Sequence, residues 1–569
     1  MLCIPDVTLT AQTGKATTES AEIARAKSLY ARGMQSLQKG DLAAARGDLA
    51  QSLALAPNSP EVHNTYGWVL LHLGEADAAS AEFQNALKLR PAFLQAHINL
   101  ANALSAQRKF VEAEAEAREA VRLAPGNSEA RRTLSRVLSF RGDVAAAIQE
   151  MRAAVAAEPS RADLHDELGS LLAQDKRDAD AAAEFSLALR LKPGFPAAAL
   201  HLGVLRWQQG DLNAAHDLIV QAAAGAPRDA RPRFYLGRVL EARNEPDSAI
   251  DEFTRAAALD PNMADAHERL GFLLQKKGEA DSAVAAFRRV VELRPSDPEA
   301  HNNLGLALIQ AGIAADAVPE FENAIRLRPE DPSFVENLGT AYLQKADFAA
   351  AITQFRKALQ IAPGDATAHY NLGLALKLSD KLELALQELR EAARLDPVQP
   401  DIRYTLGVTL WQMGRFPEAE SELRAAVRIQ PNYAEAYYTL GTVLRQAGKL
   451  DEAIEALRSA LAIDPRLIGA HTNLGAILRQ QGKTAEGDAE IHLGQQLLKQ
   501  SSNRQTAILE TNAGKKLLLA GDLDGAITKF KRAVELAPDY PPAQRFLDEA
   551  HRQKDNRERH PSGSAAQPE

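Results

Sequence analysis

Apolar residues recur along this chain at the spacing that places them on one face of a helix, in runs separated by short polar turns. In one stretch, Leu304 and Leu308 form the first run. Val318, Phe321 and Ile325 form the next run. The two runs predict two successive helices, which we call helix A and helix B, over about positions 1–14 and 16–30 of a 34-residue unit.

The same unit returns along most of the chain, and prolines mark its length. Thirteen prolines follow one another at intervals of 34 residues: Pro57, Pro91, Pro125, Pro159, Pro193, Pro227, Pro261, Pro295, Pro329, Pro363, Pro397, Pro431 and Pro465. Counted from Ala26 as position 1, position 8 is Gly in most of these units and position 20 is always Ala. Such small residues let helix axes approach closely. A single helical pair cannot bury its apolar face, so we expect stacked pairs with one continuous core.

The pattern weakens after residue 467. Lys499 replaces the proline of the fourteenth repeat, and Gly514 and Pro538 restore the internal spacing five residues late. Residues beyond 540 can form one more amphipathic helix that covers the last repeat. The expected organisation is an N-terminal extension, partly disordered, at 1–25, fourteen tandem repeats at 26–501, a short linker with a register break at 502–506, a fifteenth repeat at 507–540, a capping helix at 541–555 and a disordered tail at 556–569.

The spacing of the fixed residues resembles that of the tetratricopeptide repeat family. Gly at position 8, Ala at 20, Phe or Leu at 24, Ala at 27 and Pro at 32 carry the resemblance, which covers residues 26–540. Ala101 and Ser135 depart from the pattern at the Gly position, and Ala117 departs from it at the Phe position. The resemblance implies an all-α, right-handed superhelical solenoid of about fifteen helix-turn-helix repeats. It also implies that helices A line a concave groove that binds other proteins.

Composition excludes several other classes of protein. The net charge of -9 and the pI of about 5.9 argue against a dedicated nucleic-acid binder. No stretch approaches 18 uncharged apolar residues, so no membrane span is predicted. Cys3 is the only cysteine, which excludes a Cys-based metal site and an internal disulfide.

The first residues decide where the protein is expected to act. They lack a basic start and a clear apolar core, so no signal peptide is predicted and we expect a cytoplasmic protein. Alternatively, Val7–Ala11 is the end of a signal peptide whose true start lies upstream, which would make the protein periplasmic or secreted.

No motif in the chain predicts catalysis, a cofactor or a metal. The string from Gly475 to Thr484 has six residues between its glycines, where a phosphate-binding loop has four, and no strand precedes it. Histidines recur at position 4 of seven repeats: His63, His97, His165, His267, His301, His369 and His471. Equivalent positions in stacked helices should lie about 10 Å apart, which is too far for shared metal ligation, so structural histidines are expected.

Asparagine recurs at position 6 of helix A, and three consecutive repeats carry it as Asn303, Asn337 and Asn371. In this family position 6 faces the groove, and the pattern is similar to the asparagine ladder in the superhelix of O-linked N-acetylglucosamine transferase. An amide can bond an extended peptide backbone without reading its sequence. The alternative is that Asn-Leu-Gly is simply a common sequence in helix A, without a role in binding.

A second row of candidates is aromatic. Tyr370, Tyr404 and Tyr438 occupy position 5 of three consecutive repeats, and Trp411 is expected near the same face. These residues predict an apolar contact stripe in the groove, with packing between neighbouring helices as the alternative. Arg445 and Arg479, at position 12, could add charge for an acidic segment.

Some repeats of this family hold the C-terminal acid of chaperones with a two-carboxylate clamp, which begins with Lys at position 5. No repeat of this chain has Lys there, so a chaperone cofactor is not expected. The sequence therefore predicts a non-catalytic scaffold that binds protein or peptide segments in a concave groove, without a cofactor. The alternatives are a substrate-recruiting subunit of an enzyme on a separate chain, for example a glycosyltransferase, or a periplasmic or secreted assembly factor.

Overall fold

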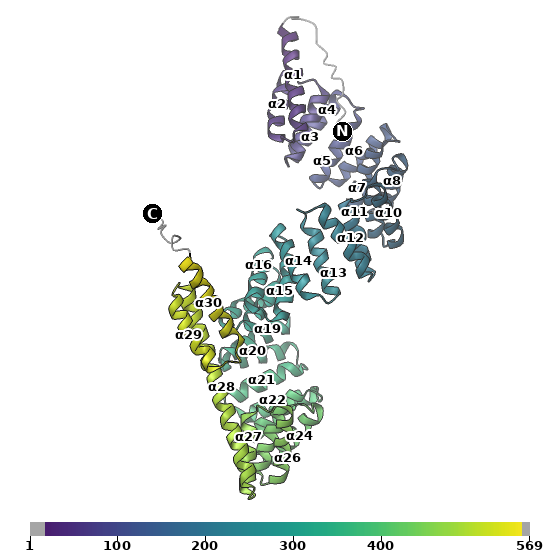
Figure 1. Ribbon diagram of the computed structural model, residues 1–569. Helices are drawn as coiled ribbons and strands as arrows, with labels where there is room; N and C mark the ends of the chain where they lie inside the picture. Colours follow the sequence, from purple (N-terminus) through teal and green to yellow (C-terminus); the bar gives the residue numbers. More distant parts are fainter. Residues whose placement is uncertain (1–17, 560–569) are drawn as a thin grey trace. The chain divides into compact units, whose positions relative to one another are not determined.

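A computed structural model describes residues 18–559, which form thirty helices and no strand (Figure 1). Two compact units divide the chain after Leu293. The first contains α1 (Thr18–Gln38), α2 (Leu42–Leu55), α3 (Pro60–His72), α4 (Ala76–Leu89), α5 (Leu94–Ala106), α6 (Phe110–Leu123), α7 (Ser128–Phe140), α8 (Val144–Ala157), α9 (Ala162–Gln174), α10 (Asp178–Leu191), α11 (Pro196–Gln208), α12 (Leu212–Gly225), α13 (Ala230–Ala242), α14 (Pro246–Leu259), α15 (Ala264–Lys277) and α16 (Ala280–Leu293). The second contains α17 (Pro298–Gln310), α18 (Ala314–Leu327), α19 (Pro332–Gln344), α20 (Phe348–Ile361), α21 (Ala366–Leu378), α22 (Leu382–Leu395), α23 (Pro400–Gln412), α24 (Phe416–Ile429), α25 (Ala434–Gln446), α26 (Leu450–Ile463), α27 (Ile468–Gln480), α28 (Thr484–Leu519), α29 (Leu523–Leu536) and α30 (Pro541–Arg559).

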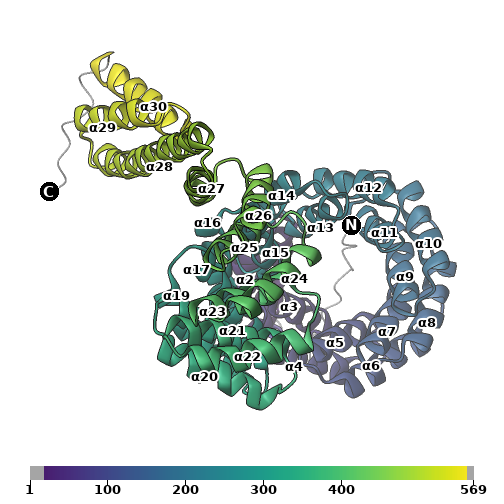
Figure 2. The same ribbon diagram turned by 90° about the horizontal axis from the view of Figure 1, so that it is seen from below.

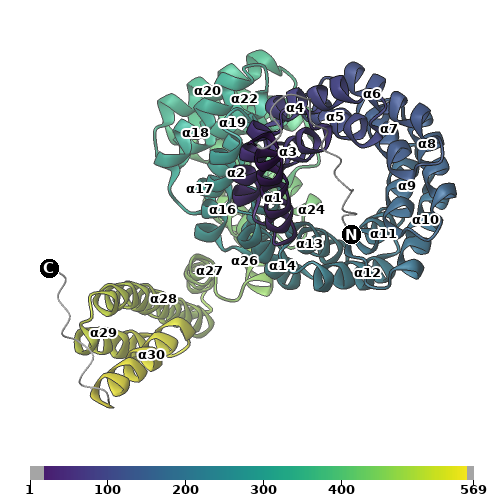
Figure 3. The ribbon, with the colours of Figure 1, turned by 90° about the horizontal axis from the view of Figure 1, so that it is seen from above.

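Within each unit, every odd-numbered helix packs against the even-numbered helix that follows it, and each pair stacks on the next. The first unit shows the consequence most clearly, because its pairs follow an arc. Odd-numbered helices α5 to α13 lie on the inside of this arc and even-numbered helices α6 to α12 on its outside (Figures 2 and 3). The predicted all-α fold of stacked helix-turn-helix repeats is confirmed.

The turn between helix A and helix B needs a left-handed residue at its centre. Gly312 takes this conformation with φ 76°, and Asn244 and Asp380 take it with φ 60° in their repeats. An aspartate often follows and caps helix B, as where Asp347 accepts a hydrogen bond of 3.1 Å from the N–H of Ala350. These local preferences fix where each helix ends.

Glycine at position 8 lets the two helices of a repeat approach closely. A Cβ atom at Gly305 would lie 2.5 Å from Cε1 of Phe321, the residue at position 24 of the same repeat. Gly339 and Phe355 repeat this arrangement, with a corresponding distance of 2.6 Å. Both phenylalanines are fully buried. The aromatic ring therefore fills the gap that the missing side chain leaves.

The structure corrects the expected linker at 502–506. These residues are helical and lie inside α28, which runs unbroken for 36 residues, so helix B of the fourteenth repeat continues into helix A of the fifteenth. The physical reason is that Lys499 stands where proline would end the helix, and no Pro or Gly follows until Gly514. Five extra residues then join two helices instead of forming a loop.

The continuous helix leaves the fifteenth repeat without its usual neighbour. Leu509, at position 3, is 65% exposed, whereas Ala436 and Ala470 at the same position are fully buried. Gln495 and Lys516 are exposed at positions that are apolar in most other repeats. The sequence is therefore adapted to an opening in the stack at this point.

The two ends compare differently with the sequence expectation. The sequence predicts that helix A of the first repeat starts early, near Thr18, within the partly disordered extension, and α1 begins there. Helix α30 instead continues to Arg559, so the first residues of the expected disordered tail are helical. Residues 1–17 and 560–569, which hold the rest of both segments and Cys3, lie outside the described residues.

Histidine at position 4 joins three segments of the fold. In the ninth repeat, Nδ1 of His301 lies 2.7 Å from a carboxylate oxygen of Glu320 on helix B, and Nε2 lies 3.1 Å from the carbonyl oxygen of Pro295 in the preceding turn. The same two contacts occur at five more histidines: His63, His97, His165, His369 and His471. Arg131 replaces histidine in one repeat and donates to the equivalent carbonyl and carboxylate. The histidine ladder therefore fixes the turn between repeats.

Both partners of each histidine are acceptors, so only the imidazolium form can donate to both. Burial alone would lower the pKa of His97, but its hydrogen bonds with Glu116 and with the carbonyl of Pro91 outweigh burial and raise the pKa above its ordinary value near 6.5. His267 lacks the glutamate, because Ala286 stands in its place, and burial lowers its pKa.

These opposite shifts predict opposite pH effects. The stabilising contribution of His97 is fully present below its unfolded pKa, about 6.5, and is lost as the pH rises through its raised folded value. The contribution of His267 is instead lost as the pH falls through its lowered value. We expect His97→Gln to lower the opening free energy of its repeat more at about pH 6 than at about pH 8, and His267→Gln to show the reverse. Amide hydrogen exchange measures both, and an equal effect of pH on the two variants would contradict the prediction.

The middle of α28 is also predicted to be the first site of proteolysis. None of the buried residues of this helix lies between Gly494 and Ala507, so little tertiary packing holds this stretch folded. Limited digestion with trypsin should cut first after Lys499 or Arg504, as mass spectrometry of the fragments would show. Earlier cuts within 298–467 would contradict this.

Candidate functional site

The sequence-predicted groove residues all lie on odd-numbered helices of the second unit. They are Asn303 on α17, Asn337 on α19, Tyr370 and Asn371 on α21, Tyr404 and Trp411 on α23, Tyr438 and Arg445 on α25, and Arg479 on α27. All are half-buried except Arg479, which is exposed. The structure thus brings them onto successive helices A, and their contacts decide which of them are available to a partner.

The asparagines at position 6 are not equivalent. Asn337 donates from Nδ2 to Oδ1 of Asn302, at position 5 of the preceding repeat, over 2.8 Å. Asn99 donates to Asn64 in the same way over 3.0 Å. Asn303 and Asn371 form no side-chain hydrogen bond within the described chain, so their amides keep their full bonding capacity.

The three tyrosines lie in the seams between neighbouring helices A. The hydroxyl of Tyr370 lies 3.4 Å from Oγ1 of Thr405, and the ring of Tyr404 lies 5.2 Å from the ring of Tyr433. A Cβ atom at Gly469 would lie 2.6 Å from the hydroxyl of Tyr438, so this tyrosine rests on the next repeat. All three also pack against one core cluster of the second unit. Their positions favour packing between helices, and the contact stripe stays a prediction.

The remaining candidates differ in their partners. Nε1 of Trp411 donates to Oε1 of Gln446 over 2.6 Å, and Arg479 pairs with Asp488 at 3.2 Å. Arg445 forms no ion pair within residues 18–559. Of the two predicted cations, Arg445 is therefore the one that is free to meet an acidic group.

A carboxyl pair on the same helices was missed by the sequence analysis. Burial, and then the neighbouring carboxylate of Asp365, raise the pKa of Glu336 to about 7. Asp365 itself accepts hydrogen bonds from the N–H groups of Thr367 and Ala368, at 2.8 and 3.1 Å, as the cap of α21. Nothing in the periodicity places position 5 of one repeat beside the cap of the next, so the pair appears only in three dimensions.

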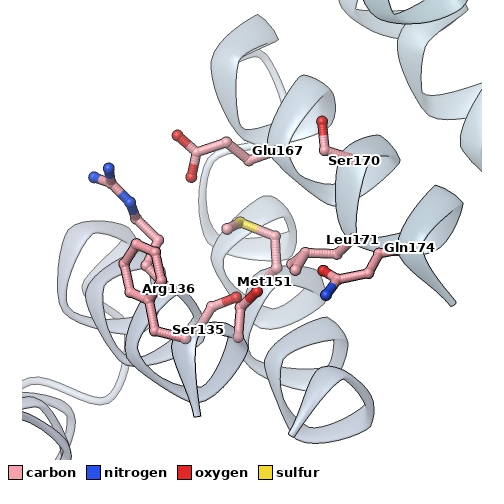
Figure 4. A pocket seen from close by; sticks show the side chains of 9 residues that line it. Ser135, Arg136, Met151, Glu167, Ser170, Leu171 and Gln174 are labelled. Carbon is pink, nitrogen blue, oxygen red and sulfur yellow. The ribbon is translucent and has the colours of Figure 1, made fainter. Parts of the chain in front are cut away.

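The first unit contains a hollow that the sequence analysis also missed. Its volume is about 300 Å³, and its walls come from α7, α8 and α9 (Figure 4). Ser135 and Met151 line it at the positions where other repeats carry Gly and Phe. The sequence carries one signal of this hollow, the departure from the repeat pattern at Ser135.

The described residues contain neither a candidate metal site nor a candidate membrane span. Within residues 18–559, no group of three His, Cys, Asp or Glu residues could hold a metal ion. Over the same range, no helix has both the length and the apolar character that crossing a membrane requires.

Comparison with known families gives matches along much of the chain. A sequence model of the C-terminal domain of cilia and flagella-associated protein 70 matches residues 273–510. Tetratricopeptide repeat models match residues 36–88 and 240–305, and residues 67–128, 132–196 and 200–264. No curated protein matches the sequence.

Solved structures similar to this chain include the APC/C hetero-tetramer Cut9–Hcn1, with 15% identity and a TM-score of 0.39 over 94% of this chain and 99% of that one. MamA matches with 25% identity and a TM-score of 0.28 over 29% of this chain and 96% of its own. PilF of Pseudomonas aeruginosa matches with 22% identity and a TM-score of 0.33 over 37% of this chain and 95% of its own. The repeat models and the repeating Gly, Ala, Phe and Pro residues show that the chain belongs to the tetratricopeptide repeat family.

Proposed function

We propose that this chain is a non-catalytic scaffold that binds an extended segment of a partner protein along its helices A. The family supports a role in protein interaction in general. One observation carries the finer proposal: Asn303 and Asn371 present unbonded, half-buried amides on helices A of the second unit. A half-buried polar group without a partner is costly unless water or a ligand satisfies it.

The spacing of these amides suits an extended peptide. Stacked helices lie about 10 Å apart, and an extended strand advances about 3.3 Å per residue, so one repeat spans about three residues of a bound segment. Asn303 and Asn371 are two repeats apart and would therefore bond the backbone about six residues apart. An amide can both donate to and accept from a peptide group, which gives binding with little dependence on partner sequence.

The double change Asn303→Ala with Asn371→Ala tests this proposal. Each lost hydrogen bond is worth about 0.5–1.5 kcal/mol, so the affinity for a peptide selected on the original chain by peptide display should fall about tenfold. Neither amide bonds within the described chain, so the melting temperature should not change. Asn323→Ala on α18, a helix B, is the matched control and should leave binding intact. Equal binding by the double variant would defeat the assignment.

The tyrosines give a separate prediction. Because Tyr404 and Tyr438 pack against the core of the second unit, their combined replacement by Ala should lower the free energy of unfolding by about 2–4 kcal/mol. Chemical denaturation followed by circular dichroism measures this loss. Unchanged stability with lost peptide binding would instead establish the tyrosines as a contact stripe.

A further inference from the structure

The inner helices of the first unit carry two adjoining hollows. The first, of about 300 Å³, lies on α7 and α9 (Figure 4). The second, of about 390 Å³, lies between α3, α5 and α7. Arg136 and Phe140, both on α7, line the two hollows together. The hollows therefore form one surface along four successive repeats, with these two side chains at its centre.

Two of the four repeats that form this surface, the third and the fourth, lack the usual Gly and Phe at the helix crossing. In the fourth repeat Ser135 replaces Gly at position 8, and its hydroxyl donates to the carbonyl of Ala147 over 2.7 Å. Met151 replaces Phe at position 24. In the third repeat both positions are alanine, Ala101 and Ala117. Side chains of smaller or more adaptable shape at the helix crossing accompany a depression on the inner face.

Of the two charged side chains that line this surface, only the positive one, Arg136, is without an ion-pair partner in the described chain. Glu167 lines the first hollow, but both of its oxygens accept hydrogen bonds of 3.0 Å from Nε of Arg132. Arg136 forms no ion pair and no side-chain hydrogen bond within residues 18–559. In Figure 4 its guanidinium group extends at the edge of the hollow, away from Met151 and Leu171. Arg136 is exposed to solvent, and a guanidinium without an intramolecular partner beside an apolar wall can pair with a carboxylate of a bound segment.

Phe140 supplies an apolar contact next to this cation. It is 61% exposed, and its ring stacks on Phe110 with the centroids 5.8 Å apart. One face of the ring is thus supported by the fold, and the side chain still presents most of its surface to solvent. An exposed aromatic residue that is supported on one face and lies between two hollows is typical of the anchor of a binding surface.

We propose that the inner face of α3, α5, α7 and α9 binds an acidic segment of a partner protein in which an Asp or Glu side chain lies next to a large apolar side chain. The carboxylate pairs with Arg136, and the apolar side chain packs on Phe140 and fills one of the hollows. The two hollows continue on either side of Phe140, so an internal segment of the partner fits better than a chain end. This inference rests on the proposed function and adds a place and a class of ligand to it.

Fluorescence anisotropy with labelled peptides of equal length tests the inference on the full chain. The probe alternates Glu with Leu and Phe and has both ends blocked, so that only side chains supply carboxylates. One comparison peptide replaces Glu with Lys, and another replaces Leu and Phe with Ser. A third has a free C-terminal carboxylate and no Glu. Only the acidic apolar probe should bind tightly, and added salt should weaken it.

Two variants locate the site. Arg136→Gln and Phe140→Ala should each weaken binding of the probe about tenfold, the loss expected for a charge-assisted hydrogen bond or a buried aromatic contact. Arg136→Gln should leave the melting temperature unchanged, and Phe140→Ala, which loses the stack on Phe110, should lower it only slightly. The controls are matched by position in the repeat: Arg238→Gln at position 9 on α13, and Leu378→Ala, which is exposed at position 13 of α21. Both controls should bind as the original chain does.

The possible results separate this inference from the proposed function. Failure of the probe to bind, or tighter binding of the Lys peptide or of the peptide with a free C-terminus, would overturn the class of ligand. If the Arg136 and Phe140 variants bound the probe as tightly as the original chain, the assignment of the binding site to this surface would be wrong. If the double change of Asn303 and Asn371 then abolished binding, the proposed scaffold function would be supported and the proposed surface on the first unit would be rejected.

Discussion

The structure depends on the close crossing of two helices within each repeat. At Gly305 and Gly339 there is no room for a Cβ atom, because the ring of Phe321 or Phe355 occupies that space. A crossing this close leaves no cavity and gives every pair nearly the same shape, so identical pairs stack with one continuous core. The alanines at position 20, such as Ala317 and Ala351, are fully buried and follow from the same constraint.

The chain departs from that constraint at two places, and at each of them the regular stacking of repeats is altered. At Ser135 and Met151 the crossing is filled differently, and a hollow opens on the inner face. At Lys499 the terminating proline is absent, and two helices join into α28 with Leu509 exposed. Regular repeats support the solenoid, and irregular ones supply surfaces that identical stacking would have covered.

Most of the fold could be predicted from the sequence because the contacts that define each repeat lie within 34 consecutive residues. The helices of each repeat, their glycine turns and the phenylalanine at the crossing depend on residues within one 34-residue unit. The helical structure of residues 502–506 could not be predicted in this way, because a polar stretch without Pro or Gly is equally compatible with a helix and with a linker. The site was harder still. Candidate residues such as Asn337 and Tyr438 were placed on the correct helices, but their contacts with the next repeat depend on how the repeats stack.

Whether an asparagine at position 6 is free to bind a partner depends on the residue that it contacts in the preceding repeat. A residue at position 6 lies beside position 5 of the preceding repeat, as Asn302 and Asn337 show. Where position 5 is a short amide, it accepts the hydrogen bond and the asparagine becomes part of the scaffold. Where position 5 is Glu336, its carboxyl group is instead paired with Asp365, and Asn371 is left unbonded. The row of asparagines thus contains both structural and available members, and for Asn337 and Asn371 the difference lies at position 5 of the preceding repeat.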